Sequence, residues 1–153
     1  MYLLSRRQLL VLRQAGAGLS TGSLRLRFGT STPSVPRGYL RMLERQPACS
    51  PGNGDESMVV VALDSDQLIG WAETRPIGPG EAELAVVVLD DWQGRGVGTL
   101  LTNALLVEPA KGRKLHAYVL PENTPMHRLV RAISPDGYER TWRDGYVHYT
   151  LAA

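Results

Sequence analysis

The stretch from residue 84 to residue 101 constrains the fold more than any other part of the chain. It begins with the apolar run LAVVVL and continues through the turn DDWQGRGVG, which has three glycines in five residues. A nearly continuous apolar run is typical of a central strand that is buried on both faces. After the turn, apolar residues recur at the spacing of an amphipathic helix, at Val97, Leu100, Leu101, Ala104 and Leu105. The stretch therefore predicts a buried strand, a tight glycine turn and a helix, in that order.

The other elements are predicted from the same kinds of pattern. Alternating or continuous apolar residues predict strands over 58–63, 67–74, 82–89 and 114–120, and a hairpin around Asp144-Gly145 within 138–151. Helices are expected over 5–15, over 36–45 with Pro36 at the first position, and from the cap Thr124 with Pro125 at the first position. Loops are expected at 76–80 and 134–137. Residues 24–28 (LRLRF) fit either a short strand or a helical turn.

The order of these elements predicts one α/β domain of the α+β type over residues 1–153. Its first part, 1–54, is expected to be helical and basic, and its second part, 55–153, to hold the sheet. A chain of 153 residues suits a single domain of this kind.

Charge is unevenly distributed along the chain. Residues 1–43 carry seven arginines and no acidic residue, a net charge of +7, whereas the remainder has a net charge of −5. An Arg-rich, acid-free start fits a transit peptide or an arm that binds a polyanion such as nucleic acid. We favour the interpretation that these arginines lie on a solvent-exposed helix face, where they also contact an acidic ligand or the acidic remainder of the chain. A nucleic-acid partner is therefore not expected.

Cysteine content and hydropathy exclude several structural features. Cys49 is the only cysteine, which excludes an internal disulfide and a multi-thiolate metal site. The chain contains no apolar run near the roughly 20 residues that span a bilayer. We therefore expect a cytoplasmic protein with neither a membrane span nor a metal.

The glycine turn suggests a site for an anion. The N-terminus of a helix has unpaired backbone N–H groups and a partial positive charge, and glycines let a phosphate come close to them. A P-loop is excluded because no lysine follows Gly98. The dinucleotide pattern G-x-G-x-x-G would need glycine in place of Thr99, although Glu122 sits where a ribose-binding acid would, so this reading stays open. A turn that only lets the helix pack tightly against the sheet also stays open.

The residues Gln93 to Gly98 read Q-x-x-G-x-G between the strand and the helix. This pattern resembles the acetyl-coenzyme A motif of the GCN5-related N-acetyltransferases (GNAT). The segments VVVLDDWQGRGVGTLL and VLPENTPM resemble the acetyltransferase domain of bacterial Pat-type protein-lysine acetyltransferases. The resemblance implies a mixed, mostly antiparallel sheet with a central splayed pair of parallel strands and about four helices. Only residues 1–4 are left for the first strand of the family, which is therefore expected to be short or absent, and a partner chain could cover that edge in a homodimer.

The resemblance also implies a set of residues that bind acetyl-coenzyme A as co-substrate. Backbone amides of the turn would hold its pyrophosphate, with a charge-assisted hydrogen bond from Arg95. The strand before the turn would bind the pantetheine arm through its backbone, with Val86 or Val87 as donor to the oxyanion. The set is Val86, Val87, Val88, Gln93, Gly94, Arg95, Gly96, Val97, Gly98, Thr99 and Asn123. Asn123 could instead, or in addition, start the helix that follows it.

The family activity is transfer of the acetyl group to a primary amine by direct attack. The amine of a protein lysine or a small molecule must be neutral to attack, and Glu83 is expected to serve as the general base, with burial beside apolar neighbours raising its pKa toward the useful range. The alternative is an exposed carboxylate paired with an arginine. The tyrosine that the family uses as general acid falls at Val130, and Tyr138 is expected only to pack. Without that acid, a non-catalytic regulatory module that binds acetyl-coenzyme A remains the alternative function.

Overall fold

The computed structural model describes residues 2–3, 18–29, 32–45, 57–107, 112–134 and 136–152. The helix predicted over 5–15, and Cys49, lie outside these ranges. The elements are β1 (Tyr2–Leu3), α1 (Thr21–Phe28), α2 (Arg37–Arg45), β2 (Met58–Asp64), β3 (Gln67–Gly78), β4 (Glu81–Val88), the 3-10 turn η2 (Asp90–Trp92), α3 (Val97–Val107), β5 (Lys114–Val119), α4 (Thr124–Ile133), β6 (Glu139–Arg143) and β7 (Tyr146–Ala152).

The strands form one sheet in the order β1-β2-β3-β4-β5-β7-β6. Only β4 and β5 pair in parallel, and every other neighbouring pair is antiparallel. This confirms the predicted mixed, mostly antiparallel sheet with a central parallel pair. The first strand is short, as expected: Tyr2 and Leu3 pair with Val61 and Val60 of β2.

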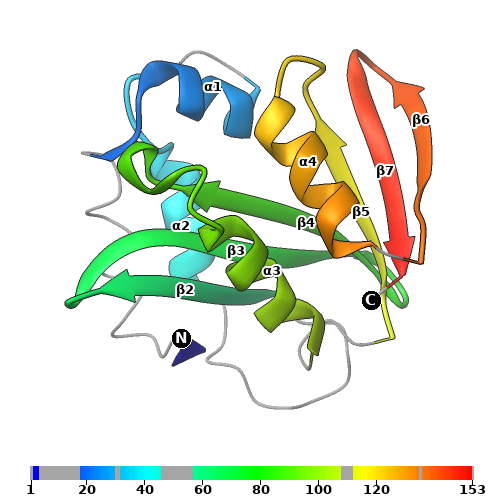
Figure 1. Ribbon diagram of the computed structural model, residues 1–153, viewed down its shortest axis with the longest axis horizontal. Coiled ribbons are helices and arrows are strands. Elements are labelled where there is room, and N and C mark those ends of the chain that lie inside the picture. The colour runs from blue at the N-terminus through cyan, green and yellow to red at the C-terminus, as the bar shows by residue number, and fades with distance from the viewer. Residues whose placement is uncertain are drawn as a thin grey trace.

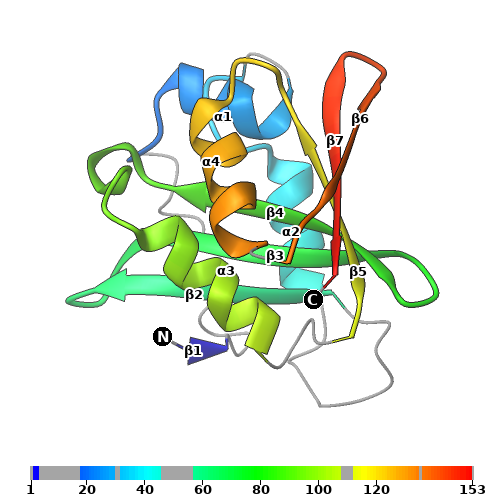
Figure 2. The same cartoon turned by 45° about the vertical axis from the view of Figure 1, so that its right-hand side comes forward.

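Helices cover both faces of the sheet, so each face has its own apolar core. Helices α3 and α4 lie on one face and α1 and α2 on the other (Figures 1 and 2). The first core contains Val97, Leu101 and Leu105 of α3 packed on β2 to β5 and β7. The second contains Leu24 of α1 with Val61, Trp71 and Val87 of the sheet. Alternate residues of each strand supply the two cores because side chains alternate between faces along a strand.

The structure decides one choice that the sequence left open and corrects two predicted boundaries. Residues 24–28 belong to helix α1, which Ser20 caps through its side chain and which ends at Gly29 in the left-handed conformation (φ 72°). The cap of α4 is Asn123, not Thr124, because the Asn123 side chain accepts a hydrogen bond from the Met126 amide at 3.2 Å. The predicted loop 76–80 is mostly strand, because β3 continues to Gly78 with an irregularity after Pro76 that accommodates the proline.

None of the helices in the described ranges has the length and apolar character of a membrane span.

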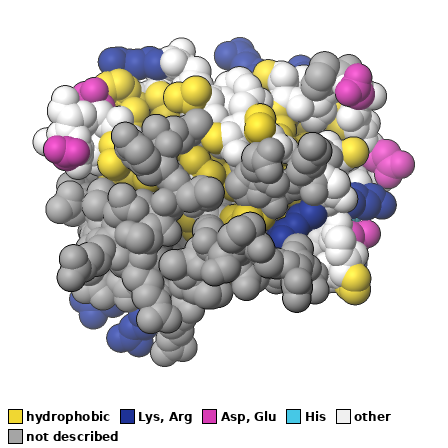
Figure 3. Space-filling model, turned by 90° about the horizontal axis from the view of Figure 1, so that it is seen from below, with side chains coloured by type: hydrophobic (Ala, Val, Ile, Leu, Met, Phe, Trp, Pro, Cys, Tyr) yellow, Lys and Arg dark blue, Asp and Glu magenta, His cyan; other side chains and the backbone are white. Residues whose placement is uncertain are grey.

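Figure 3 shows both basic and acidic side chains around the lower face of the described part, without a broad patch of one sign in that view.

A polar network crosses the second core. The indole Nε1–H of Trp71, which is fully buried, donates to the Tyr39 hydroxyl at 2.7 Å. Burial and the neighbouring Glu73 carboxylate raise the pKa of Tyr39, so its hydroxyl keeps its proton and can also donate to Glu73. Tyr39 therefore gives the buried Trp71 N–H its acceptor.

We predict that Tyr39→Phe lowers the free energy of unfolding by about 1–3 kcal/mol, because the buried Trp71 N–H loses its acceptor. Chemical denaturation followed by tryptophan fluorescence measures this loss. The matched control is Tyr138→Phe, since that ring is 37% exposed and packs edge-on against Tyr149. A loss no larger than that of the control would show that the hydrogen bond contributes nothing.

Candidate active site

Strands β4 and β5 pair over three residues and then separate. The paired residues are Glu81 with Lys114, Ala82 with Leu115 and Glu83 with His116, although β4 runs on to Val88 and β5 to Val119. In Figure 1 the two strands diverge toward the end where α1 and α4 lie. A gap in the middle of the sheet therefore opens beyond Glu83.

Backbone groups of β4 face this gap. The Leu89 amide donates to the Ile69 carbonyl of β3 at 2.9 Å, and backbone groups along a strand alternate in direction. The amide of Val87 thus also faces β3, whereas those of Val86 and Val88 face the gap. The Val88 carbonyl accepts a hydrogen bond from the Gln93 side chain at 3.1 Å. Of the two donors considered for an oxyanion, only Val86 has its N–H on the side of the gap.

A cavity of about 400 Å³ occupies the gap and continues to the head of α3. Its walls include all but one of the residues expected to bind acetyl-coenzyme A: Val86, Val87, Val88, Gln93, Gly94, Gly96, Val97, Gly98, Thr99 and Asn123. The exception is Arg95, whose guanidinium lies 5.2 Å from the ring centre of Trp92 on the exposed side of the turn. We call this cavity the groove.

The backbone conformation favours glycine at two of the three glycine positions of the turn. Gly94 and Gly96 adopt left-handed backbone angles (φ 72° and 81°), which favour glycine. Gly98 does not, and a Cβ there would meet the Leu129 and Val88 side chains at 3.6 and 3.7 Å, which is ordinary contact. Packing of the helix on the sheet therefore does not require glycine at 98. The first intrahelical hydrogen bond of α3 runs from the Leu100 amide to the Gly96 carbonyl, so the amides before it point out of the helix end.

Helix α1 forms the far wall of the groove and contacts both sides of the gap. At its start, the Ser20 amide donates to Asp90 at 3.1 Å and the Gln93 side chain donates to the Ser23 hydroxyl at 3.2 Å. Further along, Arg25 pairs with Glu122 at 2.7 Å, on the β5 side. The backbone amide of Glu122 and then Arg25 hold the pKa of the Glu122 carboxyl below its ordinary value. Glu122, the candidate ribose-binding acid, is thus an ion-pair partner of α1.

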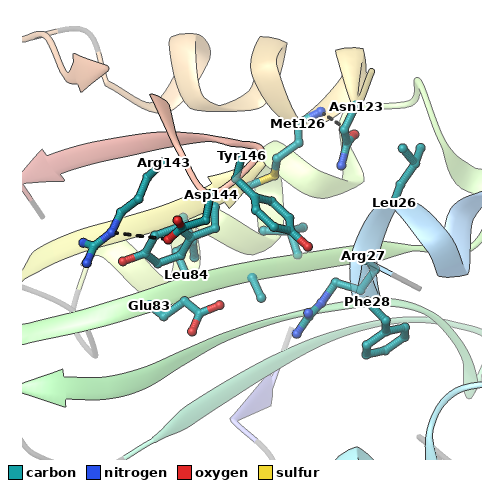
Figure 4. A pocket seen from close by; sticks show the side chains of 14 residues that line it. Leu26, Arg27, Phe28, Glu83, Leu84, Asn123, Met126, Arg143, Asp144 and Tyr146 are labelled. Atoms are coloured by element: carbon teal, nitrogen blue, oxygen red, sulfur yellow. Dashed lines mark hydrogen bonds and ion pairs between the residues drawn. The ribbon is translucent and has the colours of Figure 1, made fainter. Parts of the chain in front are cut away.

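A second cavity of about 520 Å³ adjoins the groove on the side of the β6–β7 hairpin. Arg27 from α1, Glu83 from β4 and Tyr146 from β7 surround the same space (Figure 4). The two cavities share five wall residues, namely Leu26, Arg27, Val86, Asn123 and Met126. Two compartments therefore meet beside Val86.

Glu83 lines the second cavity, but it is not buried among apolar neighbours as expected. Its carboxylate pairs with Arg75 at 2.5 Å, and 26% of its side chain is exposed. The cause is the antiparallel register, which places Arg75 of β3 directly opposite Glu83 of β4. The expectation of burial was wrong, because the side chain is partly exposed, and the arginine partner of the alternative is present.

A buried ion pair beneath both cavities was not predicted. The Arg27 guanidinium contacts the Glu73 carboxylate at 2.5 Å, and Glu73 is 5% exposed. The Arg27 guanidinium also lies over the rings of Phe28 and Tyr39, 4.9 and 5.2 Å from their centres. Burial raises the pKa of Glu73 and Arg27 opposes this. A glutamate inside an otherwise apolar strand, as in QLIGWAET, could have predicted this pair, because a buried carboxylate needs a partner.

Val130, at the position where the resemblance expects a tyrosine, is fully buried in the first core. Tyr138 lines neither cavity. Within the described ranges, no three histidine, cysteine or acidic side chains come together as a metal site would require.

Several solved structures share this fold. The GNAT domain of PAT from S. lividans is 23% identical and aligns over 99% of this chain and 89% of that one, with a TM-score of 0.79. Ribosomal-protein-alanine N-acetyltransferase from Brucella melitensis is 21% identical over 99% and 98% of the two chains, with a TM-score of 0.71. A phosphinothricin acetyltransferase from Sinorhizobium meliloti, solved with AcCoA, is 17% identical over 99% and 87%, with a TM-score of 0.69. No curated protein matches the sequence significantly.

These neighbours place the chain in the class of acetyltransferase folds. The sequence itself also identifies the family, because residues 27–133 match the family model described as acetyltransferase (GNAT) family. The chain belongs to that family, whose members are N-acetyltransferases, and the resemblance drawn from the glycine turn is confirmed.

We predict that Asn123 has two separable roles. Asn123→Ala removes the cap of α4 and is expected to lower the free energy of unfolding by about 0.5–2 kcal/mol. Asn123→Asp keeps a capping oxygen and is expected to keep the stability, but it loses the amide donor that faces both cavities. Thermal denaturation and calorimetric titration with acetyl-coenzyme A measure the two effects. Equal loss of stability in both variants would contradict the capping role.

Proposed function

We propose that the protein transfers the acetyl group of acetyl-coenzyme A to a primary amine by direct attack in a ternary complex. The observation that carries the proposal is the meeting of two cavities beside Val86, one ending at the glycine turn and the other lined by Glu83. Direct attack needs such a meeting, because the amine and the thioester must approach from different sides.

In this proposal the groove holds the coenzyme. Its pyrophosphate lies against the amides that open α3, where the helix dipole favours negative charge. Its pantetheine arm runs along β4 as an added strand would and uses the backbone groups of Val86 and the amide of Val88, which β5 no longer pairs. The match of this chain to a structure solved with AcCoA supports the assignment.

The second cavity admits the acceptor in this proposal, whether a protein lysine or a small-molecule amine. Glu83 removes a proton from the amine, and Arg75 holds the carboxylate in place. The attack places negative charge on the carbonyl oxygen, and the Val86 amide, which faces the gap, donates to it. Since Val130 cannot donate a proton, the thiolate leaves without the tyrosine that the family commonly uses.

We predict that Gly98→Ala raises stability but weakens coenzyme binding. Alanine in place of glycine favours the helix by up to about 1 kcal/mol, and the chain has room for the methyl group. The same methyl group enters the groove, so affinity for acetyl-coenzyme A is expected to fall about tenfold or more, roughly 1.4 kcal/mol. The control is Gly22→Ala in α1, which lies outside both cavities. Unchanged affinity in Gly98→Ala, measured by calorimetry, would contradict the assignment of the groove.

We predict that Glu83→Gln lowers kcat/KM for the amine by about 10²–10⁴-fold, the usual contribution of a general base. Release of free thiol from acetyl-coenzyme A, screened across amines and lysine peptides, gives the rate. Affinity for acetyl-coenzyme A is expected to stay the same, because Glu83 does not line the groove. Binding by the wild type without thiol release for any amine would instead support a regulatory module.

A further inference from the structure

Strand β6 is an open edge of the sheet. Among the described strands it pairs only with β7, and in Figure 1 no labelled element lies beyond it. All five of its side chains are exposed, and the large Trp142 ring is 65% exposed. The opposite edge ends in β1, which has two residues. Strand β6 is therefore the longer edge strand, with a row of backbone groups that no described neighbour pairs.

The hairpin turn decides which backbone groups of β6 point outward. Its two residues, 144–145, have positive φ (51° and 82°), which is typical of a type I′ turn. In a β-turn the residue before the two central ones accepts a hydrogen bond from the residue after them, so the backbone of Arg143 faces β7. Because this direction alternates along a strand, the backbone of Thr141 also faces β7. The amides and carbonyls of Arg140 and Trp142 therefore point out of the sheet.

The sequence of β6, ERTWR over residues 139–143, is complementary to itself. When two copies of the strand run antiparallel about a twofold axis at Thr141, Arg140 of one copy lies opposite Trp142 of the other. Both residues have outward backbone groups, so they can bond to each other through both of these groups. In the same register Glu139 lies opposite Arg143 of the other copy, so all five residues of each strand are paired. Twofold symmetry makes each of these pairs occur twice.

The complementarity is specific to this register. Outward backbone groups must meet outward groups, so the neighbouring registers bring Arg140 opposite Arg140 or Trp142 opposite Trp142. The first places like charges together, which is destabilising. The second moves Glu139 beyond the paired residues, opposite the hairpin turn of the other copy. Charges on an edge strand normally prevent pairing with another copy, but in the register about Thr141 they form attractive pairs.

Both faces of the paired strands gain contacts. Glu139 and Arg143 fall in a pair without mutual backbone hydrogen bonds, where opposite side chains lie closest. On the other face, the guanidinium of Arg140 comes within reach of the Trp142 indole, the aromatic group that attracts cations most strongly. Within the described ranges Glu139 and Arg140 form no ion pair, and the contact of Arg143 with Asp144 is long (3.8 Å) and exposed. These charged groups can therefore pair with another chain without giving up a strong partner.

We propose that the protein forms a homodimer in which two copies of β6 pair in this register and join the two sheets into one continuous sheet. The interface is isologous and closes on itself, so it gives dimers and not fibres. Arg143 also lines the second cavity, so Glu139 of the second copy fixes one wall of that cavity. The inference does not depend on the proposed function, because it uses the catalytic role of no residue.

The first test is the oligomeric state, measured by sedimentation equilibrium of the full chain at low salt, where charge pairs are least screened. We expect the wild type to dimerise as its concentration rises. Glu139→Arg and Arg143→Glu each place like charges opposite each other twice, so each is expected to weaken the dimer about 10-fold or more. An equimolar mixture of the two variants is expected to associate again as a heterodimer, because every charge then faces its opposite.

The controls are Arg41→Glu on α2 and Asp64→Arg at the end of β2, which make the same changes in charge at exposed positions outside β6. Both are expected to dimerise as the wild type does. A wild type that stays monomeric up to millimolar concentration overturns the inference. A dimer that neither substitution in β6 weakens also overturns it, because another surface, such as the β1 edge, then forms the interface. A mixture of the two variants that fails to associate overturns the register.

The second test locates the interface by hydrogen exchange of backbone amides, followed by NMR. The amides of Arg140 and Trp142 point outward, so in the dimer they are expected to exchange at least about 10-fold more slowly than in Arg143→Glu. Equal exchange of these amides in both proteins overturns the pairing. A monomeric wild type in which they become protected only when a lysine peptide is added would assign the edge to a peptide partner and overturn the homodimer.

Discussion

The separation of β4 from β5 after Glu83 is the constraint on which the rest of the structure depends. A buried strand normally satisfies its backbone groups through both neighbours, because an unpaired polar group away from water is costly. Here the backbone groups of Val86 and the amide of Val88 turn toward a cavity instead, whereas the Val88 carbonyl is satisfied by the Gln93 side chain. The glycine turn brings the amides of α3 to the same cavity. The gap places unsatisfied hydrogen-bonding groups along a path that an extended molecule ending in a phosphate group can follow.

The gap in turn needs a wall, and α1 supplies it mainly through polar contacts. Leu24 is the only residue of α1 that is buried, so apolar packing alone holds this helix weakly. Contacts with Asp90 and Gln93 on one side and with Glu122 on the other tie it across the gap. The pair of Arg27 with Glu73 is largely buried, with 20% and 6% of the two side chains exposed, and such a pair contributes little net stability because both charges lose most of their water. Its effect is positional, since it holds a guanidinium where the two cavities meet.

Sequence patterns predicted the central part of the fold well and the site unevenly. The strand, turn and helix from residue 84 onward depend on residues close together in the chain, and the structure has them within one or two residues of the predicted bounds. The segment LRLRF was undecided because its alternation fits a strand as well as a helical turn, and the cap Ser20 and the left-handed Gly29 make it helical. Burial of Glu83 was wrongly expected because the register that brings Arg75 opposite cannot be read from either strand alone.

By itself, the sequence determined the family, the order of the elements from β2 onward and the groove residues around the turn, because each of these depends on the spacing of residues close together in the chain. Only the tertiary structure decided which groups meet across the sheet. Arg27 reaches Glu73, 46 residues away, and His116 reaches His148, 32 residues away, through strand register and the placement of α1 over one face. The direction of the Val86 amide is likewise a property of the β3–β4 pairing. Contacts of this kind depend on how distant segments align, and a pattern within one segment carries no information about that alignment.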